Sequence, residues 1–363
     1  MARRAQVLEV DAAPESDRLA PFPHPRHTTR LFGHEVAARE LADAIASGRC
    51  HHAWLLSGPE GIGKATLAWA AATFAVCGGA AEGEAGGPLA TARDAPAAAQ
   101  VRALSYPGLL LIRIPYDLKD KRFRTVITVD EVRRLKGFLS HTVGDGGWRV
   151  VIVDTADDMN IAAANALLKS LEEPPPRTLF FLISASPGRL LPTIRSRCRT
   201  LQLGALGEAD LKGAALAAIS ASEDAVAADG AALDGLIVEA GGSVRRLLTL
   251  AAGAGAGLGP AVSGLFDRLP NVDWTQVHRL ADDLAAPANA ARYDMFFALL
   301  LDRLAGDVRG AVAGGSQPPG ALATRAELWE TLVREKASAD ALNLDRKTLV
   351  IDAVARLQAA TAR

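Results

Sequence analysis

The residues most suited to chemistry form a glycine-rich loop that ends in a lysine, Gly58-Pro59-Glu60-Gly61-Ile62-Gly63-Lys64. The loop follows a short apolar run and precedes a helical pattern rich in alanine and leucine. In this context backbone N–H groups and the helix N-terminus bind phosphate oxygens, and Lys64 would neutralise the β- and γ-phosphates. The glycines Gly58, Gly61 and Gly63 allow a close backbone approach. The pattern predicts a nucleotide site, and the alternative is a glycine-rich turn that only caps a helix.

The position after the lysine lacks the hydroxyl that normally holds Mg²⁺ in such a loop. Ala65 stands where Ser or Thr would bind the ion. Thr66 follows one residue later, about 100° further round the helix. Thr66 therefore cannot simply replace that hydroxyl, although we keep it as a candidate nucleotide contact.

A second apolar run, Arg149-Val150-Val151-Ile152-Val153-Asp154, ends in an aspartate placed to hold Mg²⁺. In hydrolysing AAA+ proteins the next residue is normally a glutamate that polarises the attacking water. Here it is Thr155, which cannot act as a general base. Because the magnesium hydroxyl and the catalytic carboxylate are both missing, we predict a site that can bind phosphate but does not hydrolyse ATP. The alternative is an ordinary variation that leaves activity intact.

Further segments resemble the bacterial clamp-loader family of AAA+ proteins. They are residues 165–175 (NALLKSLEEPP), the apolar run 179–184, Ile194-Arg195-Ser196-Arg197-Cys198, Leu31-Phe32-Gly33-His34-Glu35 and the lead-in 51–56. The resemblance covers roughly residues 28–250, and the C-terminal part shares only its helical character.

The resemblance implies roles for two arginines. In this family the arginine of the Ser196-Arg197-Cys198 motif reaches the ATP site of the adjacent gamma/tau subunit, where a guanidinium stabilises the charge of the transition state. It also implies that Arg245, in Gly242-Ser243-Val244-Arg245, faces the phosphate end of a bound nucleotide. The alternatives are a surface arginine beside a strand, with Cys198 simply buried, and an Arg245 that only pins a lid.

The resemblance also implies a function, a non-hydrolysing subunit of the DNA polymerase III clamp loader. Its partners would be the gamma/tau and delta subunits, with the sliding clamp and primed DNA reached through the complex. No cofactor is required on this interpretation, although ATP or ADP could occupy the degenerate site. Many relatives carry a four-cysteine zinc module, but only Cys77 lies in that region, so we predict no zinc and no other metal. The alternatives are a catalytically active gamma/tau-like or other P-loop ATPase, and a nucleotide-binding scaffold outside replication.

Composition limits the partners and the compartment. The 40 basic and 41 acidic side chains nearly cancel, so any contact with DNA should be local or indirect. The three cysteines contain no C-x-x-C pair, which fits a reducing cytosol. The most apolar stretch, 65–80, is too short to span a bilayer, and the N-terminus lacks a signal peptide pattern. We expect a cytoplasmic protein without membrane contact.

Parallel strands are needed to bring these motifs together. Strand candidates occur at 54–56, 109–114, 149–154, 179–184 and 200–203, and most of them are continuous apolar runs, typical of buried parallel strands. Helical patterns alternate with them, which indicates an α/β domain. The predicted fold class is therefore an α/β P-loop (AAA+) domain with a parallel sheet, a small helical lid and an all-helical C-terminal collar. The predicted divisions are an extended arm (1–30), the P-loop domain (31–204), the lid (205–252) and the collar (260–363).

Four further features have alternative interpretations. Residues 78–103 are rich in alanine, glycine and glutamate, which suggests a loosely structured insertion. The basic run 119–124 could touch a phosphate backbone or an acidic partner, or be a solvated loop. His51 and His52 are better explained as packing or surface residues than as ligands. The residue that senses the γ-phosphate in this family falls at Ser184 or Ser186, and the sequence does not choose between them.

Overall fold

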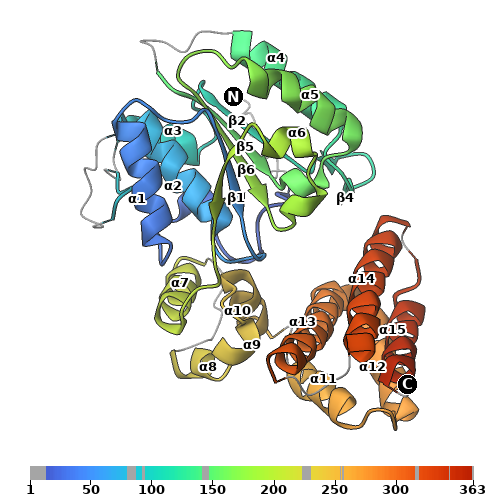
Figure 1. Cartoon of the computed structure of the whole chain (residues 1–363). Helices are drawn as coiled ribbons and strands as arrows, with labels where there is room; N and C mark the ends of the chain where they lie inside the picture. The colour runs from blue at the N-terminus through green and yellow to red at the C-terminus, as the bar shows by residue number, and fades with distance from the viewer. Residues whose placement is uncertain are drawn as a thin grey trace, which may run out of the picture. The chain divides into compact units, whose positions relative to one another are not determined.

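The structure, a computed structural model, describes residues 14–79, 87–91, 95–140, 147–222, 230–253, 255, 257–314, 319–342 and 344–361. The chain forms two units (Figure 1). The first unit comprises Met1–Ala225 with Gly242–Val244, and the second comprises Val226–Gly241 with Arg245–Arg363. The predicted division into an arm and three domains stays a prediction.

The first unit is built on a five-stranded sheet with the order β2-β5-β6-β1-β7. Its strands are β1 (Ala53–Ser57), β2 (Leu109–Arg113), β5 (Arg149–Asp154), β6 (Thr178–Ser184) and β7 (Arg199–Gln202). Every neighbouring pair is parallel. The phosphate loop and the turn after β5 therefore lie at the same edge of the sheet, beyond the carboxyl ends of the strands.

Helices cover both faces of this sheet. In Figure 1, α1 (Glu35–Ala46), α2 (Lys64–Val76) and α3 (Pro96–Arg102) lie on one side, and α4 (Val129–Ser140), α5 (Ile161–Glu172) and α6 (Pro192–Arg195) lie on the other. Each side has its own apolar core. Because both faces are covered, the central strands are largely apolar, and all seven residues of β6 are buried. The predicted α/β class with a parallel sheet is confirmed.

One sequence-based expectation about this unit is wrong. Part of the segment predicted to be a loosely structured insertion, 78–103, forms helix α3, and Ala98 and Val101 on it are fully buried. Pro96 occupies the first turn, where a missing N–H costs nothing. The alanine- and glycine-rich composition concealed this short apolar face. Residues 80–86 and 92–94 of the segment lie outside the described residues.

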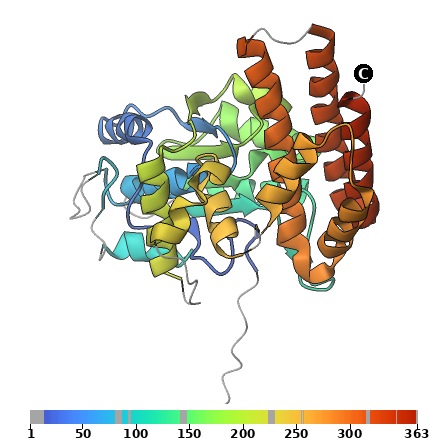
Figure 2. The ribbon, with the colours of Figure 1, turned by 90° about the horizontal axis from the view of Figure 1, so that it is seen from below.

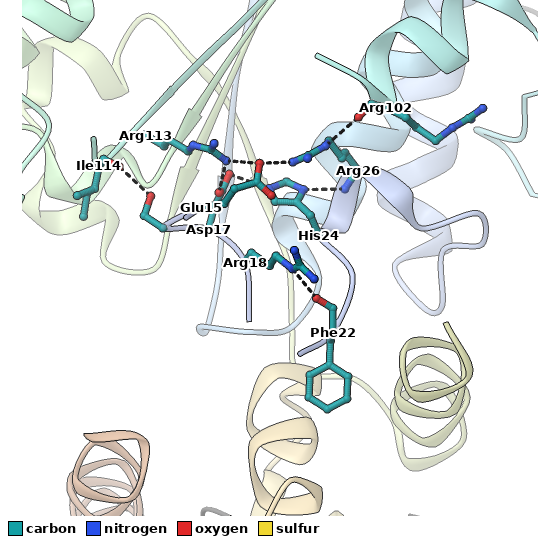
Figure 3. A network of polar contacts seen from close by, with 10 residues as sticks. Glu15, Asp17, Arg18, Phe22, His24, Arg26, Arg102, Arg113 and Ile114 are labelled. Atoms are coloured by element: carbon teal, nitrogen blue, oxygen red, sulfur yellow. Dashed lines mark hydrogen bonds and ion pairs between the residues drawn. The ribbon is translucent and has the colours of Figure 1, made fainter. Parts of the chain in front are cut away.

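The N-terminal arm, described from residue 14, packs onto the unit through a buried polar network (Figure 3). Arg113, the last residue of β2, donates to Asp17 at 2.6 Å and to Glu15 at 3.1 Å. Asp17 also lies 2.9 Å from Nε2 of His24. The Nδ1 atom of His24 accepts from the backbone N–H of Arg26, so Nε2 carries the proton that faces Asp17. The network fixes the arm to the same end of the sheet as the phosphate loop.

The chain beyond the sheet is helical. The first unit continues with α7 (Glu208–Ser220). The second unit contains α8 (Gly230–Asp234), α9 (Ile237–Ala240), α10 (Val244–Ala251, from Arg245), α11 (Leu258–Asp267), α12 (Trp274–Ala285), α13 (Ala290–Gly314), α14 (Pro319–Leu342) and α15 (Arg346–Thr361). From residue 205 onward the described part of the chain contains no strand, as predicted. Four helices begin among the described residues between 205 and 250.

The long helices of the second unit share an apolar core. Helix α14 packs beside α13 and α15, and α12 packs against α15 (Figure 2). The core is made of fully or nearly fully buried side chains, among them Phe296, Phe297, Leu300, Leu332, Val350 and Val354. Among the described residues, no helix is both long enough and apolar enough to cross a membrane.

Candidate functional site

The phosphate loop connects β1 to α2, and its shape depends on glycine. Gly58, Gly61 and Gly63 have positive φ angles of 148°, 75° and 103°. A Cβ on Gly58 would lie only 2.3 Å from the carbonyl oxygen of Leu203, directly after β7. Gly63 caps the N-terminus of α2 in the left-handed conformation. The sequence motif thus has the strand–loop–helix setting that phosphate binding requires.

Lys64 is the first residue of α2, and its side chain turns back onto the loop. Its Nζ donates to the carbonyl oxygens of Gly58 at 2.7 Å and Pro59 at 2.5 Å. Burial lowers the pKa of Lys64 below its ordinary value. The negative charges of Glu60, Asp154 and Asp157 offset only part of this decrease. The ammonium group is thereby held at the centre of the loop, where a phosphate group would meet it.

The neighbours of Lys64 do not restore the missing magnesium ligand. Ala65 packs against the apolar core of the α1–α3 side. Thr66 is half-buried in the first turn of α2. His34 lies close by, and its Nε2 is hydrogen-bonded to the carbonyl oxygen of Ile62 at 2.8 Å. His34 therefore ties the segment before α1 to the back of the loop.

The turn after β5 contains the second predicted element. Asp154 is the last residue of β5 and pairs in register with Arg113. The hydroxyl of Thr155 donates to the carboxylate of Asp158. The pKa of Asp158 is raised above its ordinary value, mainly by burial. The hydrogen bond from Thr155 opposes this increase, and the charge of Asp157 adds to it. Thr155 is thus turned toward a neighbouring aspartate, and it offers no carboxylate to a water molecule.

Asp157 joins this turn to the end of β6. Its Oδ1 accepts from Oγ of Ser184 at 2.6 Å, and its Oδ2 accepts from the backbone N–H groups of Ala185 and Ser186 at 2.6 and 3.1 Å. The two candidate sensing serines are therefore bound to one carboxylate. Ser184 contributes its side chain and Ser186 its backbone.

These contacts define what the loop can do. Backbone N–H groups and Lys64 can bind a phosphate group. Asp157 accepts three hydrogen bonds and Asp158 accepts one from Thr155, so both carboxylates already serve to bind the turn together. The arrangement suits phosphate binding.

Arg197 lies two residues before β7, the edge strand next to β1. Its NH1 donates to the carbonyl oxygen of Thr193 at 3.0 Å, and its NH2 lies 2.7 Å from Oε1 of Glu172. The side chain is 35% exposed. Ser196, just before it, donates to the same Thr193 carbonyl at 3.1 Å. The short helix α6 therefore fixes the position of the motif.

Arg197 and the phosphate loop lie at opposite ends of the same pair of strands. Arg199 pairs with Trp54 near the start of β1, whereas Gln202 pairs with Ser57 at its end, directly before the loop. A strand rises about 3.3 Å per residue, so these two levels are roughly 10 Å apart, and Arg197 lies further still from the loop. Arg197 therefore lies at the end of these strands that is remote from the phosphate loop of its own chain.

Cys198 packs against the apolar core of the α4–α6 side. Burial raises the pKa of its thiol to about 12. A thiol in this setting behaves as a small apolar group and not as a nucleophile.

Two further candidates from the sequence make contacts with their own neighbours along the chain. Arg245 belongs to the second unit, where its carbonyl accepts from Thr249 at 2.8 Å, so its role toward a nucleotide stays a prediction. In the basic run, β3 (Tyr116–Asp117) and β4 (Arg122–Phe123) form a hairpin. Two of its arginines pair with the hairpin's own aspartates, Arg122 with Asp120 and Arg124 with Asp117.

His51 and His52 stack on one another, with ring centroids 4.6 Å apart. His51 is hydrogen-bonded to the carbonyl of Ala53 and His52 to that of Leu171. Among the described residues, no group of three or more histidine, cysteine, aspartate or glutamate side chains could hold a metal ion. The absence of zinc stays a prediction.

Sequence reasoning missed two of the carboxylates that organise the site, Asp157 and Glu172. Asp157 had a local signal, because an aspartate pair directly follows the β5 turn. Glu172 had none, because its contact with Arg197 depends on how α5 and α6 pack.

Comparisons with known proteins agree with the motifs. A family profile described as "DNA polymerase III, delta subunit" matches residues 33–207. Subunit delta' of DNA polymerase III from Pseudomonas aeruginosa is 43% identical over 147 residues, which cover 40% of this chain and 41% of that protein. The Escherichia coli delta' subunit is 34% identical over 160 residues, 44% of each chain. The gamma/tau subunit of Mycobacterium tuberculosis is 31% identical over 222 residues, 61% of this chain and 36% of that protein.

The matched part spans less than half the length of these relatives. Among solved structures, a gamma subunit-related protein from Thermotoga maritima aligns with a TM-score of 0.41 and 18% identity, over 90% of this chain and 99% of that one. The resemblance to the clamp-loader family, which the sequence motifs had indicated, is confirmed by the profile and the relatives.

Proposed function

From its resemblance to delta-prime subunits of the bacterial DNA polymerase III clamp loader, we propose that this chain is a non-hydrolysing subunit of that complex. It would lend Arg197 to the ATP site of a neighbouring gamma/tau subunit. It would act in the cytoplasm during chromosomal replication, beside the delta subunit. The sliding clamp and primed DNA would be reached through the assembly.

The observation that carries the proposal is the position of Arg197. It sits beside the edge strand of the sheet, at the end of β1 opposite to its own phosphate loop. A guanidinium at that end lies far from a phosphate in its own loop, which supports a role toward a nucleotide held by another molecule. An arginine supplied in this way stabilises γ-phosphate charge in the transition state and is worth about 10³–10⁵ in rate.

The phosphate loop and the turn after β5 support the same proposal, because residues expected for ATP hydrolysis are replaced there. Ala65 replaces the magnesium hydroxyl, and Thr155 is bonded to Asp158. Gly58, Gly61, Gly63, Lys64, Thr66 and Asp154 would then form a degenerate nucleotide site, with Arg245 as a further contact. No cofactor or zinc would be required, although ATP or ADP could bind.

The test is an ATPase assay of the reconstituted complex with Arg197→Ala. We expect normal assembly and a fall of at least about a hundredfold in the turnover of the one ATP site that this arginine serves, since removed fingers cost 10³ or more. Pre-steady-state quench-flow can resolve that site from the others. Arg195→Ala, at the exposed end of α6, is the matched control. Unchanged turnover with Arg197→Ala would exclude the proposed role.

A further inference from the structure

Arg197 has a partner within its own chain. Its NH2 lies 2.7 Å from Oε1 of Glu172, and its NH1 donates to the backbone carbonyl of Thr193 at 3.0 Å. The guanidinium is therefore held at two points, one of which is a charged side chain. Charge-assisted bonds of this kind give an arginine a defined direction.

Both anchors sit on rigid parts of the first unit. Glu172 is the last residue of α5, and the preceding Leu171 is almost fully buried, with its carbonyl bonded to His52 at 2.8 Å. Thr193 lies in α6, next to the fully buried Ile194. The position of the pair is thus set by the packing of two helices.

The two anchors differ in how readily they release the arginine. The Thr193 carbonyl lies within the same short segment as Arg197 and moves with it. The Glu172 side chain is 49% exposed, and water screens such a pair strongly. A γ-phosphate carries more negative charge and more acceptor oxygens than one carboxylate. A phosphate brought up by a neighbour can therefore displace Glu172 while the Thr193 bond remains.

We propose that Glu172 is a positioning residue that holds the Arg197 guanidinium in the resting chain and yields it to the phosphate of a neighbouring nucleotide. The inference rests on the proposed function, because it assigns Glu172 a part in the delivery of that arginine. In the resting assembly the ion pair competes with engagement of the nucleotide. In the engaged assembly the carboxylate has been exchanged for phosphate.

The first test is basal ATPase activity of the reconstituted complex, without clamp or DNA, with Glu172→Gln. The amide keeps the size of the side chain and removes its charge. We expect basal turnover to rise about two- to fivefold, which is what the loss of one exposed ion pair permits. Glu173→Gln is the matched control, because Glu173 is the adjacent exposed carboxylate and no ion pair of its side chain occurs among the described residues.

The second test uses the isolated chain and does not depend on any ATPase. Phenylglyoxal labelling, followed by mass spectrometry, measures the reactivity of Arg197, with Arg195 as the internal reference. Glu172→Gln should increase the labelling rate of Arg197 by a similar factor and leave that of Arg195 unchanged. Thermal melting shows that the variant is folded.

A positioning role of Glu172 predicts both results. Basal turnover that stays unchanged or falls with Glu172→Gln, or Arg197 labelling that does not change, overturns it. Failure of the proposed function is a different outcome, in which Arg197→Ala itself has no effect on turnover. In that case faster labelling would still report the ion pair, but the pair would serve no delivery and the inference would fall with the function.

Discussion

The ammonium nitrogen of Lys64 lies 2.7 Å from the carbonyl oxygen of Gly58, so the lysine is bonded to the loop that it would share with a phosphate group. The Lys64 side chain is therefore held by the backbone of the loop itself. A phosphate that enters has to take Lys64 from two backbone carbonyls.

The isolated chain should not hydrolyse ATP. Ala65 supplies no hydroxyl for Mg²⁺, and the position after Asp154 carries Thr155 and no general base. Coupled-enzyme assays with Mg²⁺ and ATP should give the same background rate for the native chain and for Lys64→Ala. Turnover that disappears with Lys64→Ala would instead identify an active ATPase.

Gly58→Ala should destabilise the first unit. A Cβ at this position would collide with the carbonyl of Leu203 at 2.3 Å, and its φ angle is +148°. We expect a loss of about 3 kcal/mol in the free energy of unfolding, from backbone strain and the collision together, measurable by urea titration.

Gly48→Ala is the matched control, because Gly48 also has a positive φ angle, 68°, but a Cβ there meets nothing within 4 Å. It should cost only about 1 kcal/mol, the strain of the conformation alone. Equal losses for the two variants would show that the contact with Leu203 is unimportant.

Asp17→Asn should weaken the chain at neutral pH and less so in acid. Burial raises the pKa of Asp17, but the hydrogen bond and charge of His24, with those of Arg113, lower it below its ordinary value overall. A lowered folded-state pKa means that Asp17 stabilises the fold fully above pH of about 4. That contribution is lost as the pH falls through the folded-state pKa.

Unfolding at pH 7 should therefore show a loss of about 3 kcal/mol for Asp17→Asn, as for a broken buried ion pair. The difference from the native chain should shrink below pH of about 4. Asp130→Asn, which breaks an exposed pair with Arg133, should cost no more than about 0.5 kcal/mol. A difference that is the same at pH 7 and pH 3 would contradict the assignment.

Cys198 should resist alkylation in the native chain. With a thiol pKa of about 12, roughly one molecule in ten thousand carries the thiolate at pH 8. Iodoacetamide at that pH should leave Cys198 unmodified in peptide mapping and should label it after unfolding in urea. Rapid labelling of the native chain would mean that the thiol is exposed.

The sequence predicted the sheet well, for a physical reason. Strands covered on both faces are apolar over most of their length, so the apolar run within Arg149–Asp154 can be recognised from the sequence. The ends of such runs also locate the turns that carry the phosphate loop and Asp154. Helix α3 escaped because only Ala98 and Val101 reach the core, within a composition typical of loops.

The side-chain contacts between distant segments could not be predicted from local sequence patterns. Arg113 and Glu15 are 98 residues apart in the chain and meet only when the arm folds along the sheet. Glu172 and Arg197 meet because α5 and α6 pack on one face. Such pairings are decided by topology, and spacing along a single sequence does not encode them.

Strand β7 connects the arginine motif to the phosphate loop. The arginine motif directly precedes its first residue, Arg199, and Leu203, directly after its last, presses against Gly58. The glycine-rich loop therefore sets the end of the edge strand whose beginning presents Arg197. The outline of the loop and the position of Arg197 are therefore linked through one edge strand, whatever the loop binds.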